Sequence, residues 1–302
     1  MTRMRLRLPA TSANLGPGFD TLALALKLCL EIEAEPADEF TIDASGRDAA
    51  ICAATENNLL LETYRELLAA HGKPVVPLRL RMRNDIPLGM GCGSSAAVRL
   101  AAAALASQFG RLGWNRDRIL AEACRLEGHP DNAAACWLGG FVASAVNGDQ
   151  VQAVSFAPPQ EWRALIVMPQ QALATTASRA VLPAAWPCAD VVANLQRVAL
   201  LTAAFARGEP ALLANAMRDR LHQPYRAEVC PLLPKLLPLA GRSGIAGVAL
   251  SGAGPAVLLL AVSEQAAQEG KALVSAALGA SSEAVVLVCE LETQPALVET
   301  SD

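Results

Sequence analysis

The residues best suited to chemistry begin in a glycine-rich segment from Pro87 to Ala97. Glycine occupies every second position from 89 to 93, and Ser94 and Ser95 follow. Glycine tolerates positive φ and lets a ligand come close to the main chain. The alanine-rich residues that come next predict a helix, whose unpaired first amide groups suit a phosphate. A tight serine-capped turn without a ligand is the alternative, and the spacing matches neither the P-loop nor the dinucleotide motif.

A second group of polar residues, Glu127-Gly128-His129-Pro130-Asp131-Asn132, ends a stretch with apolar residues at helical spacing. A carboxylate such as Glu127 can complete a magnesium shell, because Mg²⁺ takes one or two carboxylates together with phosphate oxygens and water. Glu122, five residues earlier, is the rival ligand. A glutamate that only faces solvent is the alternative for both.

Groups suited to a charged small molecule occur in two other parts of the chain. Asn14 and Asp20 lie in a segment of small and turn-forming residues from Pro9 to Asp20. Their amide and carboxylate groups suit an ammonium or hydroxyl ligand, although such residues also cap their own loops. Arg179 and Arg226 lie beside turn residues, and an arginine fork recognises a carboxylate with two parallel hydrogen bonds. Simple surface exposure is the alternative for both arginines.

The hydrophobic pattern predicts the elements that position these groups. Apolar and polar residues alternate from Val76 to Met82, as in a half-buried strand, and Leu22 to Glu35 predicts a pair of antiparallel strands. A composition change after Pro158-Pro159 predicts two domains, residues 1–158 and 159–302. The predicted helices are 57–71, 96–109, 115–126, 190–207, 210–220 and 265–278, together with a proline-interrupted helix at 228–240. The later strands are 141–146, 162–168, 248–250, 256–262 and 284–290.

The composition is that of a globular enzyme. Of 302 residues, 53% are hydrophobic and 18% are charged, and the net charge is -4. This balance gives no reason to expect nucleic acid or an anionic membrane as a partner. Apolar runs are interrupted by Gly, Pro or charge, and the first residues do not resemble a signal peptide, so we expect a cytoplasmic protein. The eight cysteines are expected to be buried thiols, and three histidines are too few for a histidine-built metal site.

Three glycine-containing motifs resemble those of the GHMP kinase superfamily, in matching order and spacing. These motifs are Pro9 to Asp20, Pro87 to Ala97, and Ser251-Gly252-Ala253-Gly254-Pro255. Four segments resemble homoserine kinases in particular, and the match covers nearly the whole chain. They are Pro9 to Asp20, Glu127 to Asn132, Ser178 to Pro183, and His222-Gln223-Pro224-Tyr225-Arg226.

The resemblance implies an enzyme that transfers a phosphoryl group from ATP, with Mg²⁺, to the side-chain hydroxyl of L-homoserine, giving O-phospho-L-homoserine for threonine synthesis. It implies an α+β fold of two domains. The N-terminal domain (1–158) would be an ATP-binding α/β domain with a left-handed βαβ crossover. The C-terminal domain (159–302) would be a ferredoxin-like antiparallel sheet of four strands backed by helices. A homodimer is the assembly to consider.

The resemblance also assigns site residues. The amino acid would be surrounded by Asn14, Asp20, His129, Asp131, Thr175, Arg179 and Arg226. The phosphates would lie on Pro87, Leu88, Gly89, Met90, Gly91, Cys92, Gly93, Ser94, Ser95, Ala96 and Ala97, with the third motif loop formed by Ser251, Gly252, Ala253 and Gly254. Ser95 and Glu127 would hold magnesium, with Glu122 as the alternative, and Asn132 would act with them in catalysis.

Asn132 stands where many superfamily members have an aspartate, which is a candidate base there. An amide cannot take a proton, so Asn132 can only orient the attacking hydroxyl. Phosphoryl transfer needs mainly positioning and charge neutralisation, so we expect direct in-line transfer without a phosphoenzyme. Cys92 replaces the usual leucine, and a basic residue often found near Met90 is missing. The competing functions are a related kinase for mevalonate, a sugar or pantoate, and a non-catalytic relative that only binds ligand.

Overall fold

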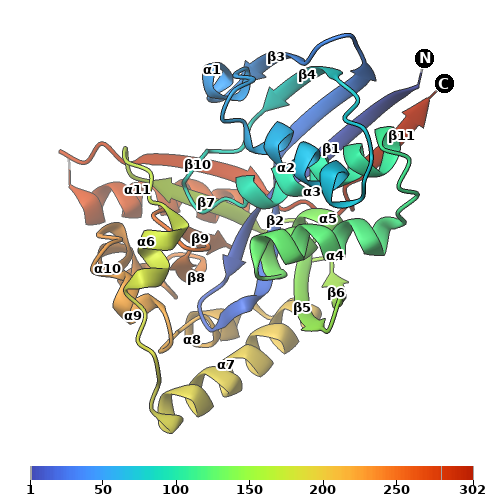
Figure 1. The fold of residues 1–302 in the computed structure, drawn as a ribbon. Coiled ribbons are helices and arrows are strands. Elements are labelled where there is room, and N and C mark those ends of the chain that lie inside the picture. The colour runs from blue at the N-terminus through green and yellow to red at the C-terminus, as the bar shows by residue number, and fades with distance from the viewer. Residues whose placement is uncertain (1, 280, 302) are drawn as a thin grey trace.

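The computed structural model describes residues 2–279 and 281–301, and its main feature is two β-sheets with helices packed against them (Figure 1). Among these residues the larger sheet has seven strands, in the order β11-β1-β2-β4-β3, with β5 beside β2 and β6 beside β5. These strands are β1 (Arg3–Asn14), β2 (Gly18–Pro36), β3 (Thr41–Gly46), β4 (Leu78–Asn84), β5 (Phe141–Asn147), β6 (Gln150–Phe156) and β11 (Leu297–Ser301). The two ends of the chain lie side by side, because β11 pairs with the start of β1 (Figure 1).

β2 is one continuous strand, so the prediction of two strands within Leu22 to Glu35 is wrong. This segment contains no Gly, Pro, Asn or Asp, and tight hairpin turns are built mainly from these residues. β2 pairs with β4 near its end, at Leu30 to Pro36, and with β5 near its start, at Leu22 to Leu24. One long strand therefore connects both halves of the sheet.

Helices pack on the apolar face of this sheet, with α3 at their centre. They are α1 (Ala49–Cys52), α2 (Leu59–Ala70), α3 (Ser94–Phe109), α4 (Arg116–Glu127) and α5 (Asp131–Leu138). The helices predicted at 57–71, 96–109 and 115–126 are confirmed to within two residues at each end. Asn58 and Asn115 cap α2 and α4 by accepting hydrogen bonds from first-turn amides. The buried residues of α3 are mostly alanine, so α2, α4 and α5 can all pack closely against it.

The second sheet has four antiparallel strands in the order β10-β7-β9-β8, which confirms the implied C-terminal sheet. Its strands are β7 (Arg163–Met168), β8 (Ile245–Leu250), β9 (Val257–Ala261) and β10 (Val285–Glu290). A helical segment separates β7 from β8, and α11 (Glu264–Leu278) separates β9 from β10. This is the βαββαβ order of a ferredoxin-like fold. The helices between β7 and β8 are α6 (Thr175–Ala180), α7 (Cys188–Arg207), α8 (Leu213–Ala216), α9 (Gln223–Arg226) and α10 (Leu232–Leu236), with 3-10 turns at Pro210–Leu212 and Leu237–Leu239.

Two helices of the second half are shorter than the sequence predicts. In place of 228–240, α10 has five residues, because Pro231, Pro234 and Pro238 remove backbone donors and interrupt the helix. In place of 210–220, the regular helix ends with α8. Beyond it, the Asp219 carboxylate accepts hydrogen bonds from the main-chain amides of Leu221 and His222, both at 2.9 Å, and turns the chain.

The chain passes from the first sheet to the second between β6 and β7, and β11 then returns to the first sheet. One hydrophobic cluster runs through both sheets, including Leu6 from β1 and Leu258 from β9. A division after residue 158 stays a prediction. β3 and β4 are parallel neighbours joined through α1 and α2. The left-handed sense of that crossover also stays a prediction.

Among the described helices, α7 is the one long and apolar enough to cross a membrane by length and composition. Leu201 and Phe205 on this helix are buried in the core. Its buried Asn194 donates to the main-chain oxygen of Pro17 at 3.2 Å and to the Asp219 carboxylate at 2.7 Å. These contacts account for α7 as a helix of the globular fold.

Three segments meet between the sheets: the end of β1, the glycine-rich loop after β4, and the β8–β9 loop. Thr11 donates its amide to the Cys92 oxygen at 3.0 Å, and the Gly252 amide donates to the Ala13 oxygen at 3.1 Å. The Ser251 hydroxyl donates to the Gly91 oxygen at 2.8 Å. Gly91 has φ +76°, and a Cβ there would lie 2.2 Å from the Ser251 oxygen. The loops can therefore touch only because this residue has no side chain.

Replacing Gly91 with alanine is expected to cost much more stability than replacing Gly113. Both glycines have positive φ, so each variant carries a backbone penalty of about 1 kcal/mol. At Gly113 nothing lies within 4 Å of the added Cβ, whereas at Gly91 it meets the Ser251 oxygen. In urea unfolding, the free energy of unfolding should fall at least about twice as much for Gly91→Ala as for Gly113→Ala. Equal losses would contradict the close contact between the loops.

Candidate active site

A cleft of about 410 Å³ opens where the end of β1, the glycine-rich loop and the β8–β9 loop meet. The predicted site residues line it, apart from Leu88, Met90, Ala97, Ser251 and the alternative metal ligand Glu122. Ala97 is fully buried in the core, and Ser251 is the buried residue that joins the loops. Residues far apart in the sequence are thus brought to one place.

A larger hollow of about 570 Å³ lies over the charged face of β1, β2 and β4. Its arginines and glutamates pair with one another across the strands, as in Arg3 with Glu35 at 2.9 Å and Arg79 with Glu35 at 3.3 Å. Such cross-strand pairs are typical of the solvated face of a sheet. The predicted site residues lie elsewhere, so we place the functional site in the smaller cleft.

One end of the cleft, called the phosphate end because the sequence predicts a phosphate there, is the start of α3. Gly93 precedes the helix in the left-handed conformation, with φ 70° and ψ 20°, and Ser94 is the first helical residue. The first-turn amides and the positive end of the helix dipole therefore face an anion site. Burial raises the pKa of the Cys92 thiol to about 12, so this side chain stays neutral and does not repel a phosphate.

Ser95 and Glu127 form the oxygen pair suited to a metal ion. The Ser95 hydroxyl donates to Glu127 Oε1 at 2.6 Å, and Arg99 Nη1 donates to the same oxygen at 2.7 Å. Glu127 ends α4, where Gly128 takes φ 82° and closes the helix. Serine and carboxylate oxygens are hard ligands of the kind that magnesium takes. These residues therefore fit a magnesium ion carried in with the nucleotide.

Glu122 lies on another side of α4 and outside the cleft. It is buried, and its carboxylate is held by Arg118 and by Arg125, the latter at 2.9 Å. Five residues along a helix amount to about 500°, so Glu122 and Glu127 face different directions. Of the two glutamates, only Glu127 can contact a ligand in the cleft.

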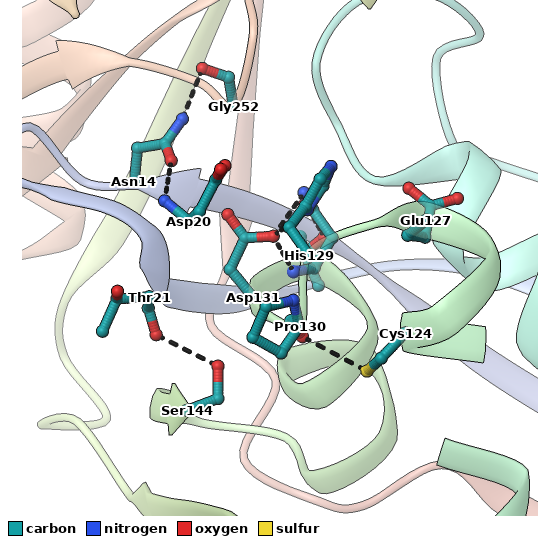
Figure 2. A network of polar contacts seen from close by, with 12 residues as sticks. Asn14, Asp20, Thr21, Cys124, Glu127, His129, Pro130, Asp131, Ser144 and Gly252 are labelled. Atoms are coloured by element: carbon teal, nitrogen blue, oxygen red, sulfur yellow. Dashed lines mark hydrogen bonds and ion pairs between the residues drawn. The ribbon is translucent and has the colours of Figure 1, made fainter. Parts of the chain in front are cut away.

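Three polar residues lie between the Ser95–Glu127 pair and the middle of the cleft: His129, Asp131 and Asn132. His129 Nδ1 lies 2.6 Å from Asp131 Oδ1 (Figure 2). The same oxygen accepts a hydrogen bond from the main-chain N–H of Asn132 at 2.7 Å. Burial disfavours the charge on His129, but the hydrogen bond and charge of Asp131 outweigh it and raise the His129 pKa. Asn132 Oδ1 accepts a hydrogen bond from the Thr11 hydroxyl at 2.7 Å. The side-chain amide of Asn132 is therefore held in place by Thr11 of β1.

Asp20 and Arg179 place opposite charges side by side. Arg179 binds both carboxylate oxygens of Asp20, at 2.7 and 3.1 Å. Asn14 holds Asp20 by accepting its amide at 3.0 Å, and it donates to the Gly252 oxygen at 2.7 Å (Figure 2). Asn14 and Asp20 both have positive φ, 68° and 54°. Such conformations cost free energy in residues with a side chain and are often found at functional sites.

Arg226 is almost fully buried and supplies a second guanidinium group to the cleft. Nε donates to the Ser178 oxygen at 3.3 Å, and Nη1 lies 3.1 Å from His222 Nδ1. Burial and the nearby charge of Arg179 lower the Arg226 pKa. A cation in such surroundings is stabilised by an added anion, and a ligand carboxylate would be one.

His222 holds Arg226 in place. Its Nε2 lies 2.7 Å from the Gly16 oxygen, a group that can only accept, so Nε2 carries the proton. Nδ1 is then free to accept from Arg226 Nη1. The imidazole ring stacks on Phe19, with the ring centroids 5.2 Å apart. Burial and the Arg226 charge lower the His222 pKa, against the opposing charge of Asp219.

Several residues of the site had no signal strong enough for prediction. Arg99, Leu126, Leu173 and Thr176 line the cleft but were not predicted. Arg99 lies four residues after Ser95 in a predicted helix, so its position on the same face could have been found. Thr11 and His222 lie within matched motifs, but their contacts depend on the tertiary structure.

The two ends of the cleft define a class of protein. One end offers helix amides and a metal-binding oxygen pair for a phosphate chain. The other offers adjacent carboxylate and guanidinium groups for a small molecule with both charges. A fold that holds both in one cleft is that of a small-molecule kinase.

Comparison with known proteins gives the family. The model of the GHMP kinase N-terminal domain matches residues 58–140, and that of the GHMP kinase C-terminal region matches residues 201–279. A homoserine kinase of Solibacter usitatus is 45% identical over 255 residues, 84% of each chain. One of Desulfitobacterium hafniense is 39% identical over 96% of this chain and 98% of its own. The crystal structure of homoserine kinase from Cytophaga hutchinsonii covers 98% of this chain and 97% of its own, with a TM-score of 0.81 and 25% identity. The chain belongs to the GHMP kinase family.

The lowered pKa of His222 predicts a pH-dependent stability. Below about pH 6.5 the unfolded histidine binds a proton that the folded protein excludes. Stability should therefore fall as the pH decreases through that value, by up to about 1.4 kcal/mol per pH unit. Urea unfolding of wild type and His222→Asn between pH 5 and 8 measures this contribution as the difference between the two curves. A difference that does not change with pH would contradict a neutral His222.

Proposed function

We propose that this protein is a homoserine kinase, which transfers the terminal phosphoryl group of ATP to the side-chain hydroxyl of L-homoserine and forms O-phospho-L-homoserine for threonine synthesis. The observation that carries the proposal is the Asp20–Arg179 pair, at 2.7 Å, beside Arg226 in the cleft. An α-amino acid bears its ammonium and carboxylate on one carbon atom. Its receptors must therefore be adjacent, as these groups are.

The proposed acceptor site uses both charges. Asp20 and Asn14, with Asp131 and His129 nearby, take the ammonium group. The ligating atoms of Asp20, His129 and Asp131 lie within 4.8 Å of one another, so they form one polar wall. Arg179 and Arg226 take the carboxylate, and Thr175 lies beside them in the cleft. The side chain of the amino acid then extends toward Asn132.

The proposed donor site is the glycine-rich loop with the start of α3. The amides after Gly93 and the hydroxyl groups of Ser94 and Ser95 bind the phosphates. Ser95 and Glu127 would hold a magnesium ion, which neutralises phosphate charge when bound. The third motif loop closes the cleft at Gly252 to Gly254.

The proposed reaction is direct in-line transfer without a phosphoenzyme. Asn132 cannot accept a proton, but its amide is fixed by Thr11 and can orient the attacking hydroxyl. The Asp131 carboxylate is already hydrogen-bonded to His129 and to the main-chain N–H of Asn132, so it orients these two residues. Catalysis then depends on alignment and charge neutralisation, which suffice for phosphoryl transfer.

The competing acceptors fit the same cleft less well. Mevalonate and pantoate carry a carboxylate but no ammonium, and a sugar carries neither, so Asp20 and Asp131 would lack a cationic ligand. A protein that only binds its ligand would not need the Ser95–Glu127 oxygen pair beside the phosphate end. The cleft therefore favours a catalytic kinase with an amino-acid acceptor.

The function is tested by a coupled assay of ADP formation with MgATP. L-homoserine is expected to support turnover, while L-serine, mevalonate and galactose give at most a small fraction of that rate. Mass spectrometry should identify phosphohomoserine as the product. ADP formation with another acceptor alone, or bound ATP with no turnover on any of the four, would contradict the acceptor assignment.

Replacing Arg226 with alanine is expected to raise the KM for homoserine by about ten- to a hundredfold, because hydrogen bonds to a charged group are lost. The affinity for ATP should remain within about twofold of wild type, since Arg226 lies at the acceptor end. Arg220→Ala is the control, because Arg220 is half exposed and pairs with Asp190 at 3.1 Å. An unchanged KM in a folded Arg226→Ala protein would remove this residue from the carboxylate site.

A further inference from the structure

Arg99 lies in the cleft but belongs to none of the recognised motifs. It is on α3, four residues after Ser95, so both side chains lie on the same face of the helix. Its side chain is 24% exposed and forms part of the cleft wall. The position places a guanidinium group at the phosphate end.

The other arginines that line the cleft are held at the end proposed for the acceptor. Arg179 binds both carboxylate oxygens of Asp20. Arg226 contacts His222 and the oxygens of Ser178 and Gly252, and it lies over the Phe19 ring. The glycine-rich segment from 87 to 97 contains no Lys or Arg. Among the arginines that line the cleft, Arg99 is therefore the one placed to supply positive charge where the phosphates are proposed to lie.

The contact of Arg99 with Glu127 leaves donors unused. Nη1 donates to Glu127 Oε1 at 2.7 Å, the oxygen that also accepts from Ser95. A guanidinium group has five N–H donors in a rigid fork, so one hydrogen bond does not exhaust it. The pairing also offsets the Glu127 charge, which would otherwise repel phosphate oxygens.

We propose that Arg99 is a nucleotide-binding residue with two contacts. One N–H group holds Glu127, and others donate to the polyphosphate of the bound nucleotide. Arg99 thereby supplies the fixed cation that the glycine-rich loop lacks, and it keeps Glu127 turned toward Ser95. The inference rests on the proposed ATP-dependent function but not on the identity of the acceptor.

Calorimetric titration with ADP and ATP tests the proposal, in EDTA and in excess Mg²⁺, on wild type, Arg99→Gln and Glu127→Gln. Arg99→Gln is expected to weaken nucleotide binding at least about tenfold in both conditions, because charge-assisted bonds to phosphate are lost. Glu127→Gln removes a negative charge, so it should tighten binding in EDTA and reduce the gain on adding Mg²⁺. The two variants thus change metal-free affinity in opposite directions.

Arg125→Gln is the matched control. Arg125 binds Glu122 at 2.9 Å on α4, outside the cleft, so its loss should leave nucleotide affinity unchanged. Arg99→Lys, which keeps the charge, should recover part of the affinity. Thermal unfolding confirms that each variant is folded.

The proposal would be overturned if Arg99→Gln bound nucleotide in EDTA as tightly as wild type does. It would also be overturned if Arg99→Gln and Glu127→Gln changed the nucleotide affinity in the same way. In either case Arg99 would act only on Glu127. These outcomes leave the proposed function standing. A wild-type protein that binds neither nucleotide would instead overturn the proposed function and this inference together. If homoserine does not support turnover, the nucleotide titrations are unaffected. The assignment of the acceptor can therefore be wrong while the role of Arg99 in nucleotide binding is still supported.

Discussion

The whole site depends on the close contact of the glycine-rich loop with the β8–β9 loop at Gly91. The Ser251 oxygen occupies the space that a side chain would need, and the Ser251 hydroxyl donates to the Gly91 oxygen. The end of β1 joins the same cluster through the hydrogen bond from Thr11 to Cys92. The glycine-rich loop is thereby fixed to Thr11 on one side and to Ser251 on the other. These hydrogen bonds pair backbone groups that would otherwise be buried without partners.

Charge is arranged so that each end of the cleft is incomplete without a ligand. Arg226 and Arg179 are neighbouring cations, with Asp20 as the carboxylate between them. Asn14 and Asp20 keep left-handed conformations that cost free energy, and surrounding hydrogen bonds hold them there. The free-energy cost of orienting these groups is thus included in folding. Little further free energy is lost to reorganisation when a ligand binds.

Local signals predicted the parts of the fold and site that local chemistry decides. Glycine spacing identified the loop around Gly91. Alanine-rich composition gave α3 and helical spacing gave α4, both to within two residues. The choice between Glu122 and Glu127 needed the structure, because either glutamate could face solvent or cleft until α4 was placed. β11 and the continuity of β2 also escaped prediction, because pairing partners far away in the sequence decide them. His222 was quoted only as part of a motif, because its role is a contact with Arg226 and Gly16.

A short segment sets the distance between the two ends. Glu127 closes α4 at the phosphate end, and Asp131 begins α5 beside Asp20 and His129. Both helices pack against α3, whose first turn is the proposed phosphate site. That turn, Glu127 and Asp131 therefore belong to one packed group of three helices. Such a fixed spacing suits direct transfer, since the hydroxyl and the phosphoryl group must meet in line without a carrier residue between them.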